Sequence, residues 1–251
     1  MLTANVPGNY DFIRTGGPFS SGCIARPGFA VVHAAIHPLT PLARGFELVD
    51  RHLRDNRRPI AALCGMQLRI PAALSPAGFE EFNRPYVERL TAWGLGTAGA
   101  NPVARTNVAL EFDPVAEPML AGFFYTAPAD GDASTFVLSG VPELTVDADG
   151  KRTIVARGDS SAGGIARKLA CVTGLLTAHL ATMRLSWADA TAINLYTVHD
   201  VYPALASELL PAIGAGARAG LTWHYSRPPV SGLEMELDAW GVRHSIVLDG
   251  A

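Results

Sequence analysis

Charge is scarce in this sequence, and neither sign of charge dominates. Charged residues make up 17% of the 251 residues, and the formal net charge is −3. A chain without an excess of basic residues produces no electrostatic field that would gather a polyphosphate backbone. The composition therefore argues against a nucleic-acid-binding protein.

Cysteine is also rare. The three cysteines, Cys23, Cys64 and Cys171, are an odd number and include no C-x-x-C pair, which argues against a disulfide framework and against a thiolate metal site. The seven histidines match no known metal-ligand spacing. We therefore expect no metal and no cofactor, and the unpaired thiols favour a reducing compartment, the cytoplasm.

Long hydrophobic runs are missing as well. The N-terminal sequence MLTANVPGNYDF has no basic segment followed by an apolar run, so we expect no signal peptide. The most apolar helical stretch, residues 165–183, contains Arg167, Lys168 and His179, which a membrane span would rarely carry. We expect no membrane partner.

Hydrophobic residues, by contrast, make up 49% of the chain, enough for extensive buried contacts. The length suits one large domain or two domains of about 125 residues each. In the first half, the spacing of apolar residues predicts the order β-α-β-α-β-β. The expected strands cover residues 29–36, 60–70, 106–112 and 119–125, and the expected helices cover 41–56 and a stretch from 79 to 90.

The second half repeats this order after a stretch rich in turn residues at 127–132, which we interpret as a linker. Expected strands cover 136–144, 191–198, 221–226 and 233–242, a tight hairpin at 147–150 leads into 153–156, and helices start near 159 and 202. The sequence thus predicts an α+β protein of two tandem repeats, residues 1–128 and 133–251, with mixed sheets each covered by two helices.

Six short motifs resemble those of the Rid (YjgF/YER057c/UK114) family, in the same order along the chain. In the first half, GPFSS at 17–21 resembles GPYSQ, FEEFNRPY at 79–86 resembles FxxMNxxY, and PVARTNV at 102–108 resembles P-x-A-R-[ST]-x-V. In the second half, FVLSG at 136–140 resembles the FVSG strand, SWAD at 186–189 with INLY at 193–196 resembles SLDDV…TVYL, and LEMEL at 233–237 resembles VEIEA.

This resemblance implies a fold, a reaction and a place for the site. Rid domains have the chorismate-mutase-like β-α-β-α-β-β fold and form trimers whose sites lie between neighbouring domains. In them an arginine binds a substrate carboxylate, while a glutamate and a water molecule hydrolyse an imine. A guanidinium suits the first task because it makes two charge-assisted hydrogen bonds to a carboxylate, and a partly desolvated carboxyl suits the second because burial raises its pKa.

The two halves depart from the family pattern in complementary ways. The first half has Arg105 but carries Gly122 where the family's glutamate would stand, and Ala34-Ala35 in place of Ser-Gly. The second half keeps Ser139-Gly140 and Glu236 but lacks the arginine strand. We therefore expect one composite site built from both halves, or from two subunits.

Each candidate residue has an expected role and a structural alternative. Arg105 would hold the carboxylate, and Glu236 would act as acid and base. Asn83 and Asn107 would orient substrate or water, Gly140 with Ser139 would face the substrate nitrogen, Phe19 would form a wall of the site, and His224 could contact substrate. Alternatively, Arg105 could be a structural ion-pair partner, Asn83 a helix cap, and Glu236 one of three acids facing solvent along its strand, with the role of Asp238 left open.

The sequence thus favours a hydrolytic deaminase that acts on a small enamine or imine carrying a carboxylate. A 2-aminomuconate-type intermediate of aromatic catabolism is a natural candidate, by analogy with single-domain relatives. Two alternatives stay open: a Rid-fold module that binds a small carboxylate without turnover, and a chorismatase-like hydrolase. Because two repeats cannot close a three-domain ring alone, we expect a homo-oligomer, with a trimer of six repeats as one arrangement.

Overall fold

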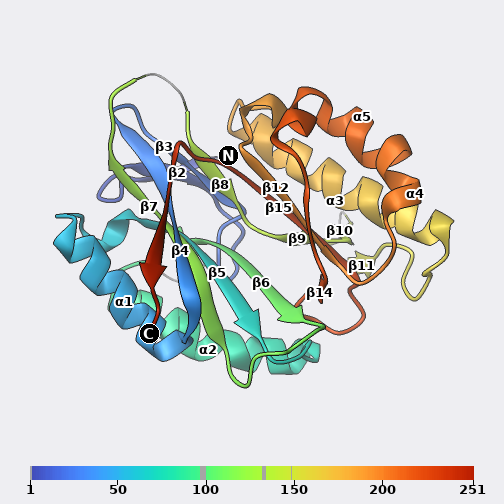
Figure 1. Ribbon diagram of the computed structural model, residues 1–251, viewed down its shortest axis with the longest axis horizontal. Helices are drawn as coiled ribbons and strands as arrows, with labels where there is room; N and C mark the ends of the chain where they lie inside the picture. Colours follow the sequence, from blue (N-terminus) through green and yellow to red (C-terminus); the bar gives the residue numbers. More distant parts are fainter. Residues whose placement is uncertain (1, 97–99, 132–133, 148) are drawn as a thin grey trace.

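The computed structural model describes residues 2–96, 100–131, 134–147 and 149–251. Two mixed sheets lie face to face, and the helices cover their outer faces (Figure 1). Helices α1 (Leu42–Asp55) and α2 (Pro76–Ala92) cover one sheet. Helix α3 (Ala162–Thr182) covers the other, together with the short helices α4 (Tyr202–Ala204) and α5 (Leu210–Ile213), which a π-helical turn at Leu205–Leu209 joins.

The first sheet has six strands in the order β14-β6-β5-β7-β4-β16. Their bounds are β14 Ser226–Arg227, β6 Ala104–Leu110, β5 Leu63–Ile70, β7 Met119–Pro128, β4 Phe29–Pro41 and β16 His244–Asp249. The second sheet has eight strands, seven of them in the order β1-β2-β3-β8-β15-β12-β13, with β9 paired to β15. Their bounds are β1 Leu2–Asn5, β2 Tyr10–Ile13, β3 Gly22–Ala25, β8 Phe136–Leu138, β15 Met235–Gly241, β12 Ala192–Thr197, β13 Thr222–His224 and β9 Val141–Pro142. A separate hairpin joins β10 (Leu144–Val146) to β11 (Arg152–Ile154).

The two sheets share one internal arrangement. In the first, β5 is parallel to β6 and antiparallel to β7, and β7 is antiparallel to β4. In the second, β12 is parallel to β13 and antiparallel to β15, and β15 is antiparallel to β8. The strands β6-β5-β7-β4 therefore correspond to β13-β12-β15-β8, and the prediction of an α+β fold with duplicated mixed sheets is confirmed.

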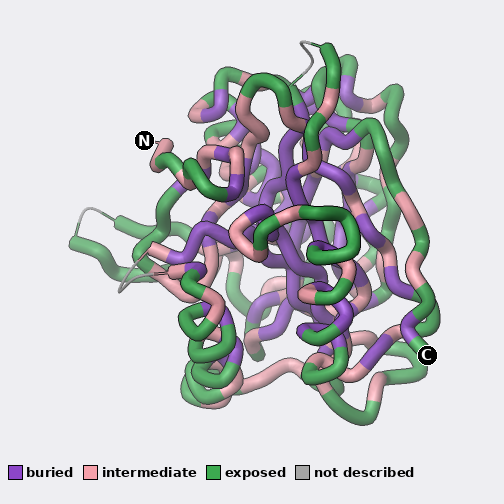
Figure 2. Tube along the Cα trace, turned by 90° about the vertical axis from the view of Figure 1, so that its left-hand side faces the viewer, coloured by how far each residue is buried: buried purple, intermediate pink, exposed green. Residues whose placement is uncertain are grey.

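The core consists of three clusters that follow these layers. One packs α3 against the outer face of the second sheet, around Leu169, Leu176 and Leu237. Another packs α1 and α2 against the first sheet, and the third lies between the sheets. Buried backbone accordingly runs through the middle of the molecule, while exposed turns lie at its periphery (Figure 2).

The terminal segments cross between the sheets, which the sequence did not predict. Strands β1, β2 and β3 extend the second sheet through a pairing of β3 with β8, and β16 pairs in parallel with β4 in the first sheet. Local periodicity cannot reveal the pairings of β3 with β8 and of β16 with β4, because these partners are more than 100 residues apart in the chain. The boundaries 1–128 and 133–251 therefore stay a prediction.

Some predicted bounds need correction. The strand expected at 136–144 is broken into β8 and β9, because Ser139 and Gly140 leave the sheet to bond with β6. The linker expected at 127–132 begins inside β7, which extends to Pro128, and its last residue lies outside the described part, as does residue 148 of the predicted hairpin turn. Among the described helices, none has both the length and the apolar character that crossing a bilayer requires.

Candidate active site

Strand β6 places Arg105 beneath α2, in a ring of aromatic side chains. Arg105 and Asn107 pair with Met66 and Leu68 of β5, whose side chains pack toward the helices. The guanidinium carbon of Arg105 lies 4.5 Å from the ring centre of Phe19 and 4.6 Å from that of Tyr86, and it also faces the rings of Phe79 and Phe82. Aromatic faces attract a cation at these distances.

This ring encloses a group of polar atoms without hydrogen-bond partners. Within the described part of the chain, no partner is found for both Nη atoms of Arg105, both side-chain amide atoms of Asn107, Oδ1 of Asn83 and the Tyr86 hydroxyl, and all of these atoms are buried. Buried polar atoms are nearly always paired in folded proteins. Such a cluster, with a guanidinium at its centre, is suited to an anionic ligand with several oxygen atoms.

Arg105 carries its positive charge at neutral pH despite its burial. Only 3% of the residue is exposed. Burial lowers its pKa to about 10, while Tyr86 and Glu236 act in the opposite direction. Among the described residues no carboxylate lies within ion-pair distance of it, so the alternative of a structural ion pair is not supported.

The second repeat meets Arg105 through the backbone. The amide of Arg105 donates to the Ser139 hydroxyl at 2.9 Å, and that hydroxyl donates to the carbonyl of Ser20. The amide of Gly140 approaches the carbonyl of Arg105 at 3.3 Å and the Thr106 hydroxyl at 3.1 Å. These bonds hold Ser139 and Gly140 on the edge of β6.

Glu236 lies directly against Gly140. A Cβ atom at Gly140 would stand 1.8 Å from Oε1 of Glu236, so the carboxyl occupies the space that any other residue's side chain would take. Glu236 is 3% exposed, which rules out the alternative of a solvent-facing strand acid. Burial, followed by the nearby Asp238, raises the pKa of Glu236 well above its usual range, while Arg105 and Arg69 act in the opposite direction. Glu236 is therefore suited to donate a proton near neutral pH.

Asp238 connects the strands around Glu236. Its carboxylate accepts hydrogen bonds from the Thr106 hydroxyl at 2.6 Å, the Asn194 amide at 2.8 Å and the Tyr196 hydroxyl at 3.0 Å. Burial raises its pKa to about 6, and these three donors oppose that shift. The Thr106 hydroxyl also accepts a hydrogen bond from the amide of Gly140. Through Thr106, Asp238 therefore helps to position the glycine that contacts Glu236.

His224 lies on the Glu236 side of the site, in the layer between the sheets. Its ring stacks on Tyr196 with centroids 4.5 Å apart, and Nε2 lies 3.1 Å from the side-chain oxygen of Asn194. Burial, and then the charge of Arg69, lower its pKa to about 4, so the imidazole is neutral at pH 7. It belongs to the Asp238 network rather than to the aromatic ring around Arg105.

The strand register shows why the two halves complement each other. Gln67 faces Thr106 and Gly122, while Tyr196 faces His224 and Glu236. When Gln67 is matched with Tyr196, Gly122 corresponds to Glu236 and Thr106 corresponds to His224. Arg105 and Trp223, which precede Thr106 and His224, then correspond to each other.

In the first repeat the acid's place is occupied by other side chains. A Cβ at Gly122 would lie 2.6 Å from Oε1 of Gln67 and 3.2 Å from Nε2 of His33, and these two side chains lie 3.0 Å apart. The first repeat thus keeps the guanidinium without the acid, and the second keeps the acid without the guanidinium.

The structure brings most of the predicted residues together along the β6 edge. Arg105, Asn107 and Phe19 lie beneath α2, which itself contributes Asn83, while Ser139, Gly140, Glu236 and His224 come from the second repeat. Asn83 lies in the middle of α2, whose N-cap is Ser75, so it is not a cap. Two further residues near the site, Tyr86 and Arg69, were not among those predicted from the sequence. Tyr86 could have been found as the last residue of the FxxMNxxY-like motif, and Arg69 as the only charge in an apolar strand.

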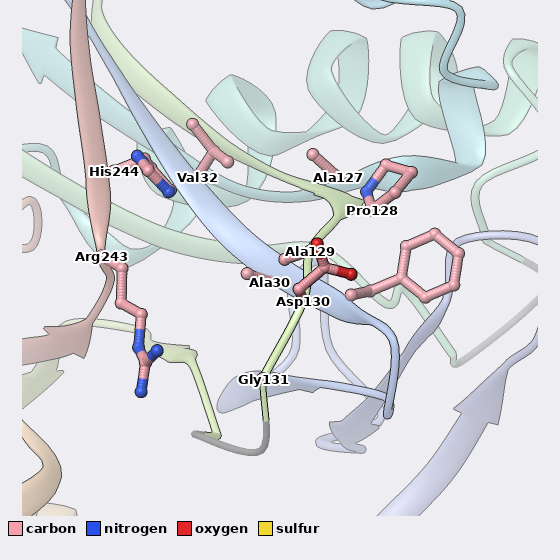
Figure 3. Close-up of a pocket in the computed structure, with 10 residues that line it drawn as sticks. Ala30, Val32, Ala127, Pro128, Ala129, Asp130, Gly131, Arg243 and His244 are labelled. Carbon is pink, nitrogen blue, oxygen red and sulfur yellow. The ribbon is translucent and has the colours of Figure 1, made fainter.

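Two hollows on the described surface lie apart from this site, and one of them, of about 410 Å³, lies beside Thr191 and Arg218. The other, of about 220 Å³, lies between the ends of β4 and β7 and the turn before β16, beside Asp130 and Arg243 (Figure 3). It shares no residue with the cluster around Arg105. Among the described residues there is no group of three or more histidine, cysteine, aspartate or glutamate side chains that could hold a metal ion.

Comparison with known proteins identifies the family. The family model described as 2-aminomuconate deaminase CnbZ matches residues 2–246. The chain belongs to the CnbZ family. A 2-amino-5-chloromuconate deaminase of Comamonas testosteroni is 38% identical over 245 residues, which cover 96% of this chain and 97% of that protein.

Membership of the CnbZ family confirms the prediction of a deaminase family made from the sequence motifs. Solved structures with some similarity include a chorismatase, with 12% identity over 88% of this chain and 77% of that one and a TM-score of 0.49. They also include the Rid-family protein YyfB of Yersinia pestis, with 20% identity over 47% of this chain and 83% of that one and a TM-score of 0.28. The assignment to the CnbZ family comes from the sequence matches.

Replacement of Gly140 by alanine tests the contact with Glu236. The added methyl group would collide with the carboxyl group of Glu236, so we expect this carboxyl to move. The kcat of deamination should then fall by about 10²–10⁴-fold, the range for loss of a general acid. The control is Gly174→Ala on α3, where a methyl group meets nothing within 4 Å. Unchanged kcat in a folded G140A variant would contradict the placement of Glu236 in the site.

The pH dependence of stability tests the raised pKa of Glu236. A carboxyl whose pKa is higher in the folded than in the unfolded state stabilises the fold below the unfolded pKa of about 4.3, and this contribution is lost as the pH rises toward the folded pKa. Glutamine does not ionise, so Glu236→Gln should gain Tm relative to the wild type as the pH increases from 4.5 to 8. The exposed Glu80→Gln serves as control. A Tm difference that is the same for both variants at every pH would refute the raised pKa.

Proposed function

We propose that this protein hydrolyses the C–N bond of 2-aminomuconate or a close analogue and releases ammonia. One observation carries the proposal. Arg105 has a buried, charged guanidinium without a counter-ion in the described part of the chain, and its backbone carbonyl bonds to Gly140, against which the buried carboxyl of Glu236 lies. The family description and the name of the Comamonas relative support the substrate class.

In this proposal the Arg105 side of the site binds the carboxylate next to the reacting carbon. The two Nη atoms of Arg105 would donate to the carboxylate oxygens, and Asn107 and the Tyr86 hydroxyl would complete its hydrogen bonds. Phe19 and Phe79 would exclude water from this end. Exclusion of water strengthens each charge-assisted bond because the local dielectric constant falls.

Glu236 would move the protons. The enamine takes a proton from the Glu236 carboxyl at its distal carbon and becomes an iminium ion. Water then adds to the iminium carbon and returns a proton to the Glu236 carboxylate. In the resulting carbinolamine the hydroxyl proton is transferred to nitrogen as the C–N bond breaks, which leaves a 2-oxo acid and ammonia. The raised pKa of Glu236 supports this role because it favours the protonated carboxyl that can donate to the enamine.

Replacement of Arg105 tests the proposal directly. Loss of two hydrogen bonds to a charged group, each worth about 1.5–3 kcal/mol, should lower kcat/KM of Arg105→Met by about 10²–10⁴-fold. The measurement is ammonia release from 2-aminomuconate generated in situ, and the control is Arg84→Met on the exposed face of α2. Absence of ammonia release by the wild type would instead favour a non-catalytic carboxylate-binding module, and turnover of chorismate would favour a chorismatase-like hydrolase.

We also propose that the protein is a cytoplasmic homo-oligomer, with a trimer as one arrangement. Three free thiols support a reducing compartment, and exposed apolar side chains near the sheet edges, Phe112, Trp223, Tyr225 and Val247, support self-association. Light scattering during size exclusion should give a multiple of the chain mass of 26.5 kDa. A mass equal to that of one chain at micromolar concentration would refute the oligomer.

A further inference from the structure

Arg69 is a charge in a strand that otherwise contains none. It lies in β5, where Met66 and Leu68 pack toward the helices. Because side chains alternate along a strand, Arg69 and Gln67 point to the opposite side, into the layer between the two sheets. There the guanidinium carbon of Arg69 lies 6.0 Å from the ring centre of Tyr196 in the second sheet.

The guanidinium of Arg69 has few direct partners among the described residues. The only hydrogen bond of its guanidinium within the described residues goes from Nη1 to the carbonyl of the adjacent Leu68, and no carboxylate there lies within 4 Å. Of the two nearby acids, Glu236 has its pKa raised by burial, which favours the neutral carboxyl, and the carboxylate of Asp238 is engaged by three donors. The remaining N–H groups of the Arg69 guanidinium, together with its positive charge, can therefore bind a further anion.

Glu236 lies within the electrostatic range of two guanidinium groups, those of Arg105 and Arg69. The groups lie on opposite faces of the first sheet, since Arg105 faces α2 and Arg69 faces the second sheet. The edge strand β6 runs between the two groups. It bonds to Gly140 at Arg105 and pairs with β14 at Ala109 and Leu110. Asn107, with both amide atoms unpartnered in the described structure, lies between these two contacts.

We propose that Arg69 binds the second carboxylate of the substrate and makes the site selective for dicarboxylic enamines. This inference rests on the proposed function, because a muconate has a carboxylate at each end of a six-carbon chain. With the first carboxylate on Arg105 and the reacting carbon at Glu236, the far carboxylate extends toward Arg69. A substrate with one carboxylate fills only the Arg105 end.

A matched pair of unreactive ligands tests this assignment. Muconate and sorbate share the six-carbon diene, but muconate has a carboxylate where sorbate has a methyl group. Isothermal titration should show that the wild type binds muconate about 10- to 100-fold more tightly than sorbate, as expected for hydrogen bonds to one additional charge. Arg69→Gln should abolish this preference by weakening muconate alone, whereas Arg105→Met should weaken both ligands.

Two variants serve as controls. Arg69→Lys retains the positive charge and should keep part of the preference for muconate, so a folding defect of Arg69→Gln can be recognised. Arg227→Gln removes a guanidinium near the same strand edge that is already paired with Glu111 at 2.7 Å, and it should leave the ratio of the two affinities unchanged.

The outcomes separate this inference from the proposed function. Equal affinity of the wild type for muconate and sorbate would overturn the role of Arg69, as would an unchanged ratio in a folded Arg69→Gln variant. A ratio that depends on Arg69 would support the inference even if no ammonia were released from 2-aminomuconate. In that case the deaminase proposal alone would fail.

Discussion

The structure depends on a short set of hydrogen bonds at the edge of β6, where the two repeats meet. Ser139 and Gly140 of the second repeat bond to the backbone of Arg105, and Thr106 donates to Asp238. These bonds satisfy a strand edge that would otherwise be buried without partners, which is costly in a protein interior. They also bring the backbone of Arg105 to the glycine that supports Glu236. A contact needed to complete the sheet edge thus also assembles the proposed active site.

Duplication allowed the two repeats to divide the chemical groups between them. Arg105 corresponds to Trp223, and Gly122 corresponds to Glu236, so each repeat has lost the group that the other retains. Neither retained group contributes to stability in the way that a core residue does. A buried guanidinium that has no counter-ion among the described residues and a carboxyl whose pKa is raised by burial both oppose folding at neutral pH. Such costs are typical of functional sites, where the ligand supplies the missing partners.

Much of the fold could be predicted from the sequence, because regular strands and amphipathic helices show their periodicity locally. The pairings that attach β3 to β8 and β16 to β4 could not, since these partners lie in opposite halves of the chain. Arg105, Asn83 and Glu236 were found because they stand in motifs that resemble a known family. The network of Asp238 and Tyr196 was not found, because alternation along a strand does not tell which face meets a second sheet. Arg69 is visible in the sequence as a single charged residue between apolar ones. Its position is explained by the second sheet, where its guanidinium lies over the ring of Tyr196.

The crossing of the terminal strands has a consequence for how the chain is made. Strand β16 completes the first sheet by pairing with β4, although more than 200 residues separate them. During synthesis the first repeat therefore leaves the ribosome before β16 has been made. The outer edge of β4 has no strand partner until residues 244–249 have emerged. Strand β3 of the second sheet likewise has no partner on its β8 side until residues 136–138 have been made. In the nascent chain the edge of β4 therefore needs protection while more than 200 further residues are added.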